Sequence, residues 1–223
     1  MSSFLFLIAA RKGSTRLKNK NILKINKKTL IERTIEFSKK ISQKNDKILV
    51  STDSDKIQKI AIKEKVLCPW LRPMKLSGSK AAMDKVILHA IQWYQKKFNK
   101  KLDCLILLQP TTPFRNIIHF RKCIKQYKKT KKSIISVRSI YEFFSDIYFV
   151  KNKKMQLNKK KNLFVPNGSM YILNVKNFLK FKSIKKMNKS FFLMKNKFTL
   201  DIDYEHQYVL AKKIEKINRT KVF

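Results

Sequence analysis

Two short stretches of this chain combine the residue types that phosphate chemistry needs. The first is the loop "ARKGSTRLKNKN" (residues 10–21), which follows an apolar run and carries one of only three glycines in the chain. Glycine lets the backbone turn so that its N–H groups approach an anion, and arginine and lysine neutralise phosphate charge. The pattern is neither a Walker loop nor G-x-G-x-x-G, so on pattern alone a phosphate site and a solvated basic turn are equally good interpretations. The scarcity of glycine favours the phosphate site.

The second stretch holds two carboxylates, Asp201 and Asp203, in a chain with only 14 acidic residues. If residues 197–203 ("KFTLDID") form a strand, positions i and i+2 lie on one face, and both carboxylates can converge on a hard cation such as Mg²⁺. An alternative for Asp203 is the N-cap of a closing helix, but a cap does not explain Asp201. Together with a basic loop, the pair indicates a nucleoside triphosphate and Mg²⁺.

Strand and helix patterns alternate along the first 137 residues, which predicts an α/β fold with a mostly parallel sheet flanked by helices. The expected strands are 4–10, 47–55 (running into a polar turn), 102–115 (broken by two prolines), 132–137, 168–173 and 197–203. The expected helices are 29–41, 56–65, 79–98, 116–128 and 204–218. Residues 141–161 lack clear periodicity and are interpreted as an antiparallel excursion and subunit contact. One domain spans residues 1–223 on this interpretation.

In an open α/β sheet, ligands bind at the carboxyl ends of the strands. Gln109 follows an apolar strand there, and its amide can read sugar hydroxyls or carboxylates; an ordinary polar residue at a strand end is the alternative. Asn167 and Gly168 stand in "VPNGSMYI", for which a type I′ hairpin turn is the favoured interpretation by pattern.

The net charge of +39 suggests at first a nucleic-acid or membrane-surface binder. Only eight of the 53 basic residues are arginine, and the lysines are spread along the whole chain together with Asn, Ile and Phe. Those four residues share A/T-rich codons, so biased composition is favoured over a nucleic-acid interface. Three widely spaced cysteines form neither a disulfide framework nor a zinc pattern and suit a reducing cytoplasm. No apolar run is long enough to span a bilayer.

Six segments, in this order, resemble the acylneuraminate cytidylyltransferase family, whose members make CMP-activated sialic acids and related sugars. The first loop is similar to the family motif ARGGSKRIPGKN. The other similar segments are "STD" (51–53), "RPMKL" (72–76), "LQPTTPFR" (108–115), "PNGSMYI" (166–172) and "DIDYEHQY" (201–208).

The resemblance implies a Rossmann-like nucleotide-diphospho-sugar transferase fold and a homodimer. It also implies a reaction, in which the anomeric hydroxyl of a nine-carbon 2-keto sugar acid attacks the α-phosphorus of CTP. The implied catalytic residues are Arg11, Lys20, Asp201 and Asp203, the last two as Mg²⁺ ligands. The implied nucleotide-binding residues are Ala10, Arg11, Gly13, Ser14, Lys20, Asn21 and Arg72, and the implied substrate-binding residues are Gln109, Thr111 and Asn167.

The chain departs from the family pattern at three places. Lys18 and Asn19 replace the usual Pro and Gly, residues 78–84 ("GSKAAMD") lack the usual serine near the base, and residues 158–165 contain no arginine before "PNG". Lysine cannot reproduce an arginine fork. Two other functions therefore remain open: a degenerate member that binds nucleotide without turnover, and a basic nucleic-acid-binding protein.

Overall fold

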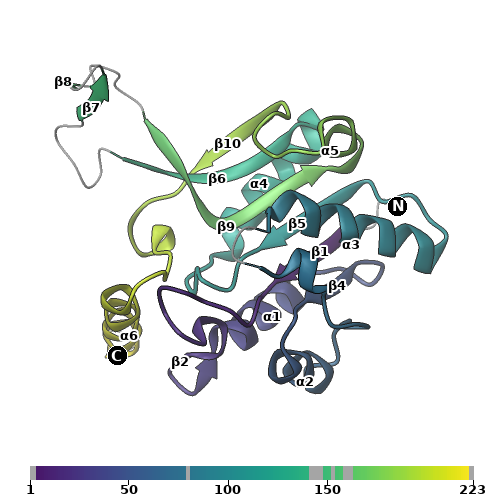
Figure 1. The fold of residues 1–223 in the computed structure, drawn as a ribbon, viewed down its shortest axis with the longest axis horizontal. Coiled ribbons are helices and arrows are strands. Elements are labelled where there is room, and N and C mark those ends of the chain that lie inside the picture. Colours follow the sequence, from purple (N-terminus) through teal and green to yellow (C-terminus); the bar gives the residue numbers. More distant parts are fainter. Residues whose placement is uncertain (1–3, 79–80, 141–147, 152–153, 158–162, 221–223) are drawn as a thin grey trace.

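A six-stranded sheet forms the centre of the computed structural model, which describes residues 4–78, 81–140, 148–151, 154–157 and 163–220 (Figure 1). In spatial order its strands are β10 (Lys189–Leu193), β6 (Ser133–Ser139), β9 (Phe164–Asn174), β5 (Cys104–Leu108), β1 (Phe4–Ala9) and β4 (Lys47–Ser51). β1 runs parallel to β4 and β5, and β10 runs parallel to β6, whereas β9 is antiparallel to both of its neighbours. The predicted mostly parallel α/β sheet is confirmed.

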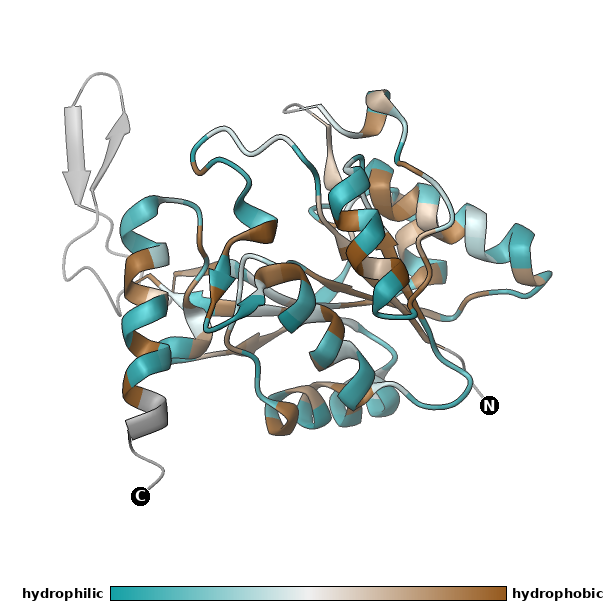
Figure 2. Ribbon diagram, turned by 90° about the horizontal axis from the view of Figure 1, so that it is seen from below, coloured by the Kyte–Doolittle hydropathy of each residue, from teal (hydrophilic) through white to brown (hydrophobic). Residues whose placement is uncertain are grey.

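Helices cover both faces of the sheet because its central strands are apolar on both sides. Leu5 and Leu7 of β1 pack with α3 (Met83–Phe98) and α5 (Val175–Phe181), and Phe6 packs with α4 (Ile117–Thr130). In Figure 2 the hydrophobic colour runs through the strands, while the helices carry both colours. A strand buried on both faces reads as a continuous apolar run, which is why β1 and β5 were recognisable in the sequence.

The remaining helices surround the end of the molecule that carries the first loop. They are α1 (Leu30–Ile41), α2 (Asp55–Lys63) and α6 (Glu205–Thr220), with three 3₁₀ turns, η1 (Lys20–Ile22), η2 (Met74–Leu76) and η3 (Asn196–Thr199). A two-residue pairing of β2 (Lys24–Ile25) with β3 (Lys28–Thr29) leads into α1. No helix in the described part of the chain is both long and apolar enough to cross a membrane.

Local sequence fixes the start of α1. The Thr29 hydroxyl accepts a hydrogen bond from the Glu32 backbone N–H, and the Glu32 carboxylate accepts one from the Thr29 N–H at 2.7 Å, which completes a capping box. Burial alone would raise the pKa of Glu32, but the hydrogen bonds from Thr29 outweigh it and lower that pKa.

The sheet register brings three strand ends to one edge. Ala9 of β1 lies opposite Ser51 of β4, and Ile8 lies opposite Leu108 of β5. All three strands run the same way, so the residues after them, in the first loop, in "STD" and in "QPTT", meet above the same edge.

The segment Lys197–Asp203 is not a strand, contrary to the sequence prediction. It forms η3 and a loop, and the edge strand is β10, which the prediction missed. Phe198, Leu200 and Ile202 alternate like a strand because they pack into apolar clusters from a loop, and the Ile202 N–H donates to the Thr111 carbonyl at 2.8 Å. The alternation of apolar and polar residues here reflects burial of the apolar side chains and not pairing within the sheet.

Two other predictions need adjustment. The helix expected over residues 79–98 begins at Met83, and residues 79 and 80 lie outside the described part. Within the excursion, the described residues form an antiparallel pair, β7 (Tyr148–Lys151) with β8 (Lys154–Leu157), as expected of a ribbon; residues 141–147, 152–153 and 158–162 lie outside the described residues.

Asn167 and Gly168 do not form a hairpin turn, contrary to the favoured interpretation. They lie inside β9, in a bulge where the register against β6 shifts between Ile135 and Val137. Gly168 has a φ of +72°, in the left-handed region, so the Asn-Gly signal correctly located a positive φ but in the wrong kind of element.

Candidate active site

A cavity of about 360 Å³ opens above the shared edge of β1 and β5. That volume suits a small-molecule ligand. It brings together nine of the predicted site residues: Arg11, Ser14, Lys20, Asn21, Arg72, Gln109, Thr111, Asp201 and Asp203. Three predicted residues are absent from its lining: Ala10, Gly13 and Asn167. A larger cavity of about 720 Å³ lies at the other end of β5, but it has no carboxylate pair.

The first loop is held in place by a buried leucine and a left-handed asparagine. Leu17 packs with Phe114 and Ile202, so the residues on either side of it project away from the core. Asn19, which stands where the resembled motif has glycine, adopts a φ of +55° just before η1. Asparagine is among the residues that tolerate this region best, so this departure keeps the loop geometry. The buried Asn21 amide then donates to the Arg11 carbonyl at 2.9 Å and ties the two ends of the loop together.

Gly13 shows no conformational need in this structure, contrary to the expectation from glycine scarcity. Its φ is not positive, and a Cβ added there would meet no atom within 4 Å. A side chain at residue 13 would therefore extend into open space beside the loop. Ala10 is likewise a structural residue, fully buried, and its N–H donates to the Ser51 carbonyl at 3.0 Å.

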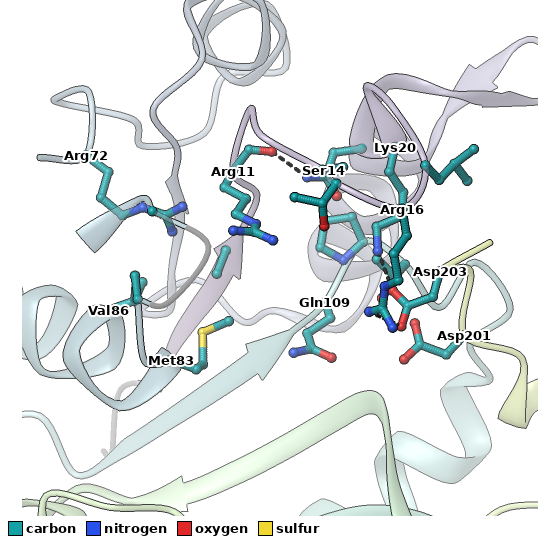
Figure 3. Close-up of a pocket in the computed structure, with 18 of the residues that line it drawn as sticks. Arg11, Ser14, Arg16, Lys20, Arg72, Met83, Val86, Gln109, Asp201 and Asp203 are labelled. Carbon is teal, nitrogen blue, oxygen red and sulfur yellow. Dashed lines mark hydrogen bonds and ion pairs between the residues drawn. The ribbon is translucent and has the colours of Figure 1, made fainter. Parts of the chain in front are cut away.

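At one end of the cavity, Asp203 is held by two cations of the first loop (Figure 3). The Lys20 ammonium lies 2.5 Å from one carboxylate oxygen, and the Arg16 guanidinium lies 2.6 Å from the other. The carboxylate therefore does not cap α6; the Gln207 side chain accepts from the Asp203 and Tyr204 N–H groups instead. The N-cap interpretation of Asp203 is wrong.

Arg16 lies in the first loop but is not among the predicted site residues. Its guanidinium also stacks 5.0 Å from the Tyr204 ring centre, and the hydrogen bond to Tyr204 together with the Asp203 charge raises the pKa of Arg16. Its position in the same basic loop, four residues before Lys20, was the sequence signal that could have identified Arg16 as a site residue.

Asp201 has a different environment from Asp203. Its Oδ1 is buried and accepts no hydrogen bond from the described residues. Burial raises the pKa of Asp201, with the Asp203 charge adding to the rise, while a hydrogen bond from Thr111 and the Lys20 charge oppose it. A buried carboxylate oxygen without a hydrogen-bond partner is suited to bind a cation or a proton.

At the opposite end of the cavity, Arg72 is buried and lies beside the first turns of α3. Its Nε donates to the Ser77 hydroxyl at 3.2 Å, and its Nη2 lies 3.8 Å from Asp53. Burial lowers the pKa of Arg72, against the attraction of Asp53. Asp53 in turn accepts the Lys12 N–H at 2.7 Å, so "STD" links the first loop to Arg72. That linking role was missed, since the sequence shows the motif but not its partners.

Gln109 lies between the two ends and points into the cavity (Figure 3). Its backbone carbonyl accepts three hydrogen bonds, from the Thr112 N–H, the Thr112 hydroxyl and the Arg115 guanidinium.

Arg115 was given no role by the sequence, yet it contacts three parts of the fold. Its Nε donates to the Ser169 carbonyl at 3.0 Å and its Nη1 to the Thr34 hydroxyl at 3.3 Å. Burial lowers the pKa of Arg115, and the Asp201 charge opposes this; an arginine stays charged there at neutral pH.

Asn167, a predicted substrate-binding residue, is 1% exposed and shapes the β9 bulge instead. Its side-chain oxygen accepts from the Ser136 hydroxyl at 2.7 Å and from the Ser169 N–H at 3.2 Å. Its side-chain nitrogen contacts the Met194 sulfur at 3.3 Å, so both ends of the carboxamide are engaged within the protein. The expectation that Asn167 binds substrate came from the resemblance of "PNGSMYI" to the family motif, and that motif does not show the partners of the side chain.

Comparisons with known proteins identify the family of this chain. A family model described as cytidylyltransferase matches residues 5–223. The chain belongs to the cytidylyltransferase family. An N-acylneuraminate cytidylyltransferase of Escherichia coli is 31% identical over 97% of this chain and 53% of its own length. A CMP-N,N'-diacetyllegionaminic acid synthase of Legionella pneumophila is 29% identical over 96% of this chain and 97% of its own.

The fold of this cytidylyltransferase-family enzyme also matches solved structures. A CMP:2-keto-3-deoxy-manno-octonic acid synthetase complexed with CTP has a TM-score of 0.68, with 14% identity over 99% of this chain and 100% of the other. At that identity the match concerns the fold alone. The chain spans about half the length of the Escherichia coli relative and nearly all of the Legionella one.

Proposed function

We propose that this enzyme condenses CTP with a nine-carbon 2-keto sugar acid of sialic, legionaminic or pseudaminic type, giving a CMP-sugar and pyrophosphate. One observation carries the proposal: a single cavity joins loop cations to two carboxylates, with a side-chain amide between them. The cations suit a triphosphate, and the relatives named for CMP-sugar acids give the substrate class. Arg11, Lys20, Ser14 and Asn21 would bind the triphosphate end of CTP, and Arg72 would lie by the base.

The donor set fits Mg²⁺. Asp201 and Asp203 supply carboxylate oxygens, which Mg²⁺ prefers, and one oxygen of Asp201 is buried without a described partner. Mg²⁺ is commonly held by one or two carboxylates together with substrate phosphates, so a site with two acids suffices. When bound, the ion would neutralise phosphate charge. Because Lys20 and Arg16 occupy both oxygens of Asp203, the triphosphate would draw these cations away from that carboxylate.

The chain's own residues would act by positioning and by charge. The anomeric hydroxyl oxygen forms a bond to the α-phosphorus of CTP, the bond from that phosphorus to pyrophosphate breaks, and the hydroxyl proton leaves. Lys20 and Arg11 stabilise the negative charge that develops on the phosphates. Asp201, whose pKa burial raises, would accept the proton.

We also propose that the enzyme is a homodimer and works in the cytoplasm. The antiparallel pair β7–β8 offers a contact away from the cavity, and the three cysteines are buried free thiols, which suit a reducing compartment.

The test is pyrophosphate release from CTP and Mg²⁺ with a panel of nine-carbon 2-keto acids, using ATP, GTP and UTP as controls. Release with CTP and one acid supports the proposal and names the acceptor. If the folded protein binds CTP but releases no pyrophosphate with any acid, the degenerate-member alternative replaces it. Salt-dependent binding of any DNA or RNA without nucleotide turnover would instead support the nucleic-acid-binding alternative.

A further inference from the structure

Gln109 and Gly168 lie in unusually close contact. The Gln109 N–H donates to the Gly168 carbonyl at 3.4 Å, and a Cβ added at Gly168 would lie 2.3 Å from the Gln109 Oε1 atom. Real Cβ atoms essentially never lie that close to another atom, so a Cβ at residue 168 would force the Gln109 amide to move. The positive φ of Gly168 makes glycine doubly suited to this position.

Arg115 fastens the two backbones that carry this contact. One of its nitrogens donates to the carbonyl of Gln109, and Nε donates to the carbonyl of Ser169, next to Gly168. The third nitrogen reaches Thr34 of α1. A planar guanidinium can serve three acceptors in fixed directions, whereas a lysine ammonium at the end of a flexible stem cannot.

The Gln109 amide itself is uncommitted. Its backbone groups are all engaged, but its side-chain nitrogen and oxygen form no hydrogen bond within the described residues. The side chain points into the cavity that Asp201 also lines (Figure 3). A polar side chain that is free to form hydrogen bonds, on a residue whose backbone is held in place, is suited to bind a ligand.

We propose that Arg115 is a positioning residue that, with Gly168, fixes the Gln109 amide against the acceptor sugar acid. This rests on the proposed function, in which Gln109 contacts the acceptor and the loop cations contact CTP. Arg115 touches neither substrate; it acts through Gln109.

The experiment compares Arg115→Lys and Gly168→Ala with Arg121→Lys, an exposed arginine of α4, as the matched control. KM for the acceptor acid should rise about tenfold in the first two variants, as when a hydrogen bond to a charged or polar group is lost, while KM for CTP stays within about twofold. In a Gln109→Ala background neither change should add to the acceptor KM. Equal rises in both KM values, or full additivity with Gln109→Ala, would show a general structural role and overturn the proposal.

A second readout needs no turnover. The side-chain amide NMR signal of Gln109, assigned by its loss in Gln109→Ala, should shift or broaden in Arg115→Lys and Gly168→Ala but not in Arg121→Lys. An unchanged signal overturns the positioning role. If the signal moves while wild-type protein releases no pyrophosphate with any acid, the positioning role stands and the proposed function fails.

Discussion

Replacing Asp203 with asparagine tests the carboxylate end of the cavity most directly. The change keeps the size of the side chain but removes the charge that pairs with Lys20 at 2.5 Å and with Arg16 at 2.6 Å. The Arg16 side chain is 52% exposed, so solvent screens its pair with Asp203, whereas the Lys20 side chain is only 14% exposed and its pair is worth about 1 kcal/mol. The free energy of unfolding should therefore fall by about 1 kcal/mol, a small part of a domain's typical stability.

The catalytic loss should be much larger than the loss of stability. If Asp203 supplies a metal ligand, several kcal/mol of charge stabilisation disappear in the transition state, and each 1.36 kcal/mol is a factor of ten in rate. We therefore expect Mg²⁺-dependent turnover to fall by at least about 100-fold. Pyrophosphate release against Mg²⁺ concentration measures this, and thermal unfolding measures the fold.

Asp103→Asn is the matched control, because it makes the same change of charge at an exposed residue before β5, at the opposite end of that strand from Gln109. It should keep wild-type turnover. Asp203→Asn protein that unfolds within about 8 °C of wild type yet keeps its Mg²⁺-dependent turnover would refute the metal assignment.

Three further outcomes are expected. Arg72→Lys should raise KM for CTP about tenfold and leave KM for the acceptor unchanged, since lysine cannot contact Ser77 and Asp53 together; equal changes in both constants would contradict the placement of Arg72 beside the base. Glu32→Gln should destabilise the protein at neutral pH. Because the folded-state pKa of Glu32 is lowered, the stability that its carboxylate contributes is fully present above the unfolded-state pKa and is lost as pH falls through the folded-state pKa. A difference in denaturation midpoint between variant and wild type that persists in acid would contradict this. Light scattering at micromolar concentration should give twice the chain mass of 26.5 kDa, and a monomer would contradict the homodimer.

Much of the fold was readable from the sequence because the central strands are buried on both faces. β1, β4 and β5 appear as short apolar runs followed by polar turns, and the amphipathic helices between them show their apolar faces directly. The order of the strands then requires that the residues after them share one edge. Nine of the twelve predicted site residues line the cavity there.

The failures come from segments whose pattern depends on distant partners. Residues 197–203 alternate like a strand, but their apolar side chains pack from a loop, and the sheet edge is taken by β10. Asn167 and Gly168 have the residue types of a hairpin turn, and only the pairing of β9 with β6 shows that they form a bulge.

The sequence by itself determined the identity and order of the reactive groups: a basic loop after one strand, an amide after another and two carboxylates near a closing helix. Residue type and strand periodicity are local properties, so one chain segment at a time reveals them. Tertiary structure decided which groups are engaged and which remain available. It paired Asp203 with Lys20 and Arg16, left the buried Oδ1 of Asp201 without a described partner, and placed Arg115 where three elements meet. These outcomes depend on burial and on contacts between residues as far as 187 positions apart, which no local pattern records.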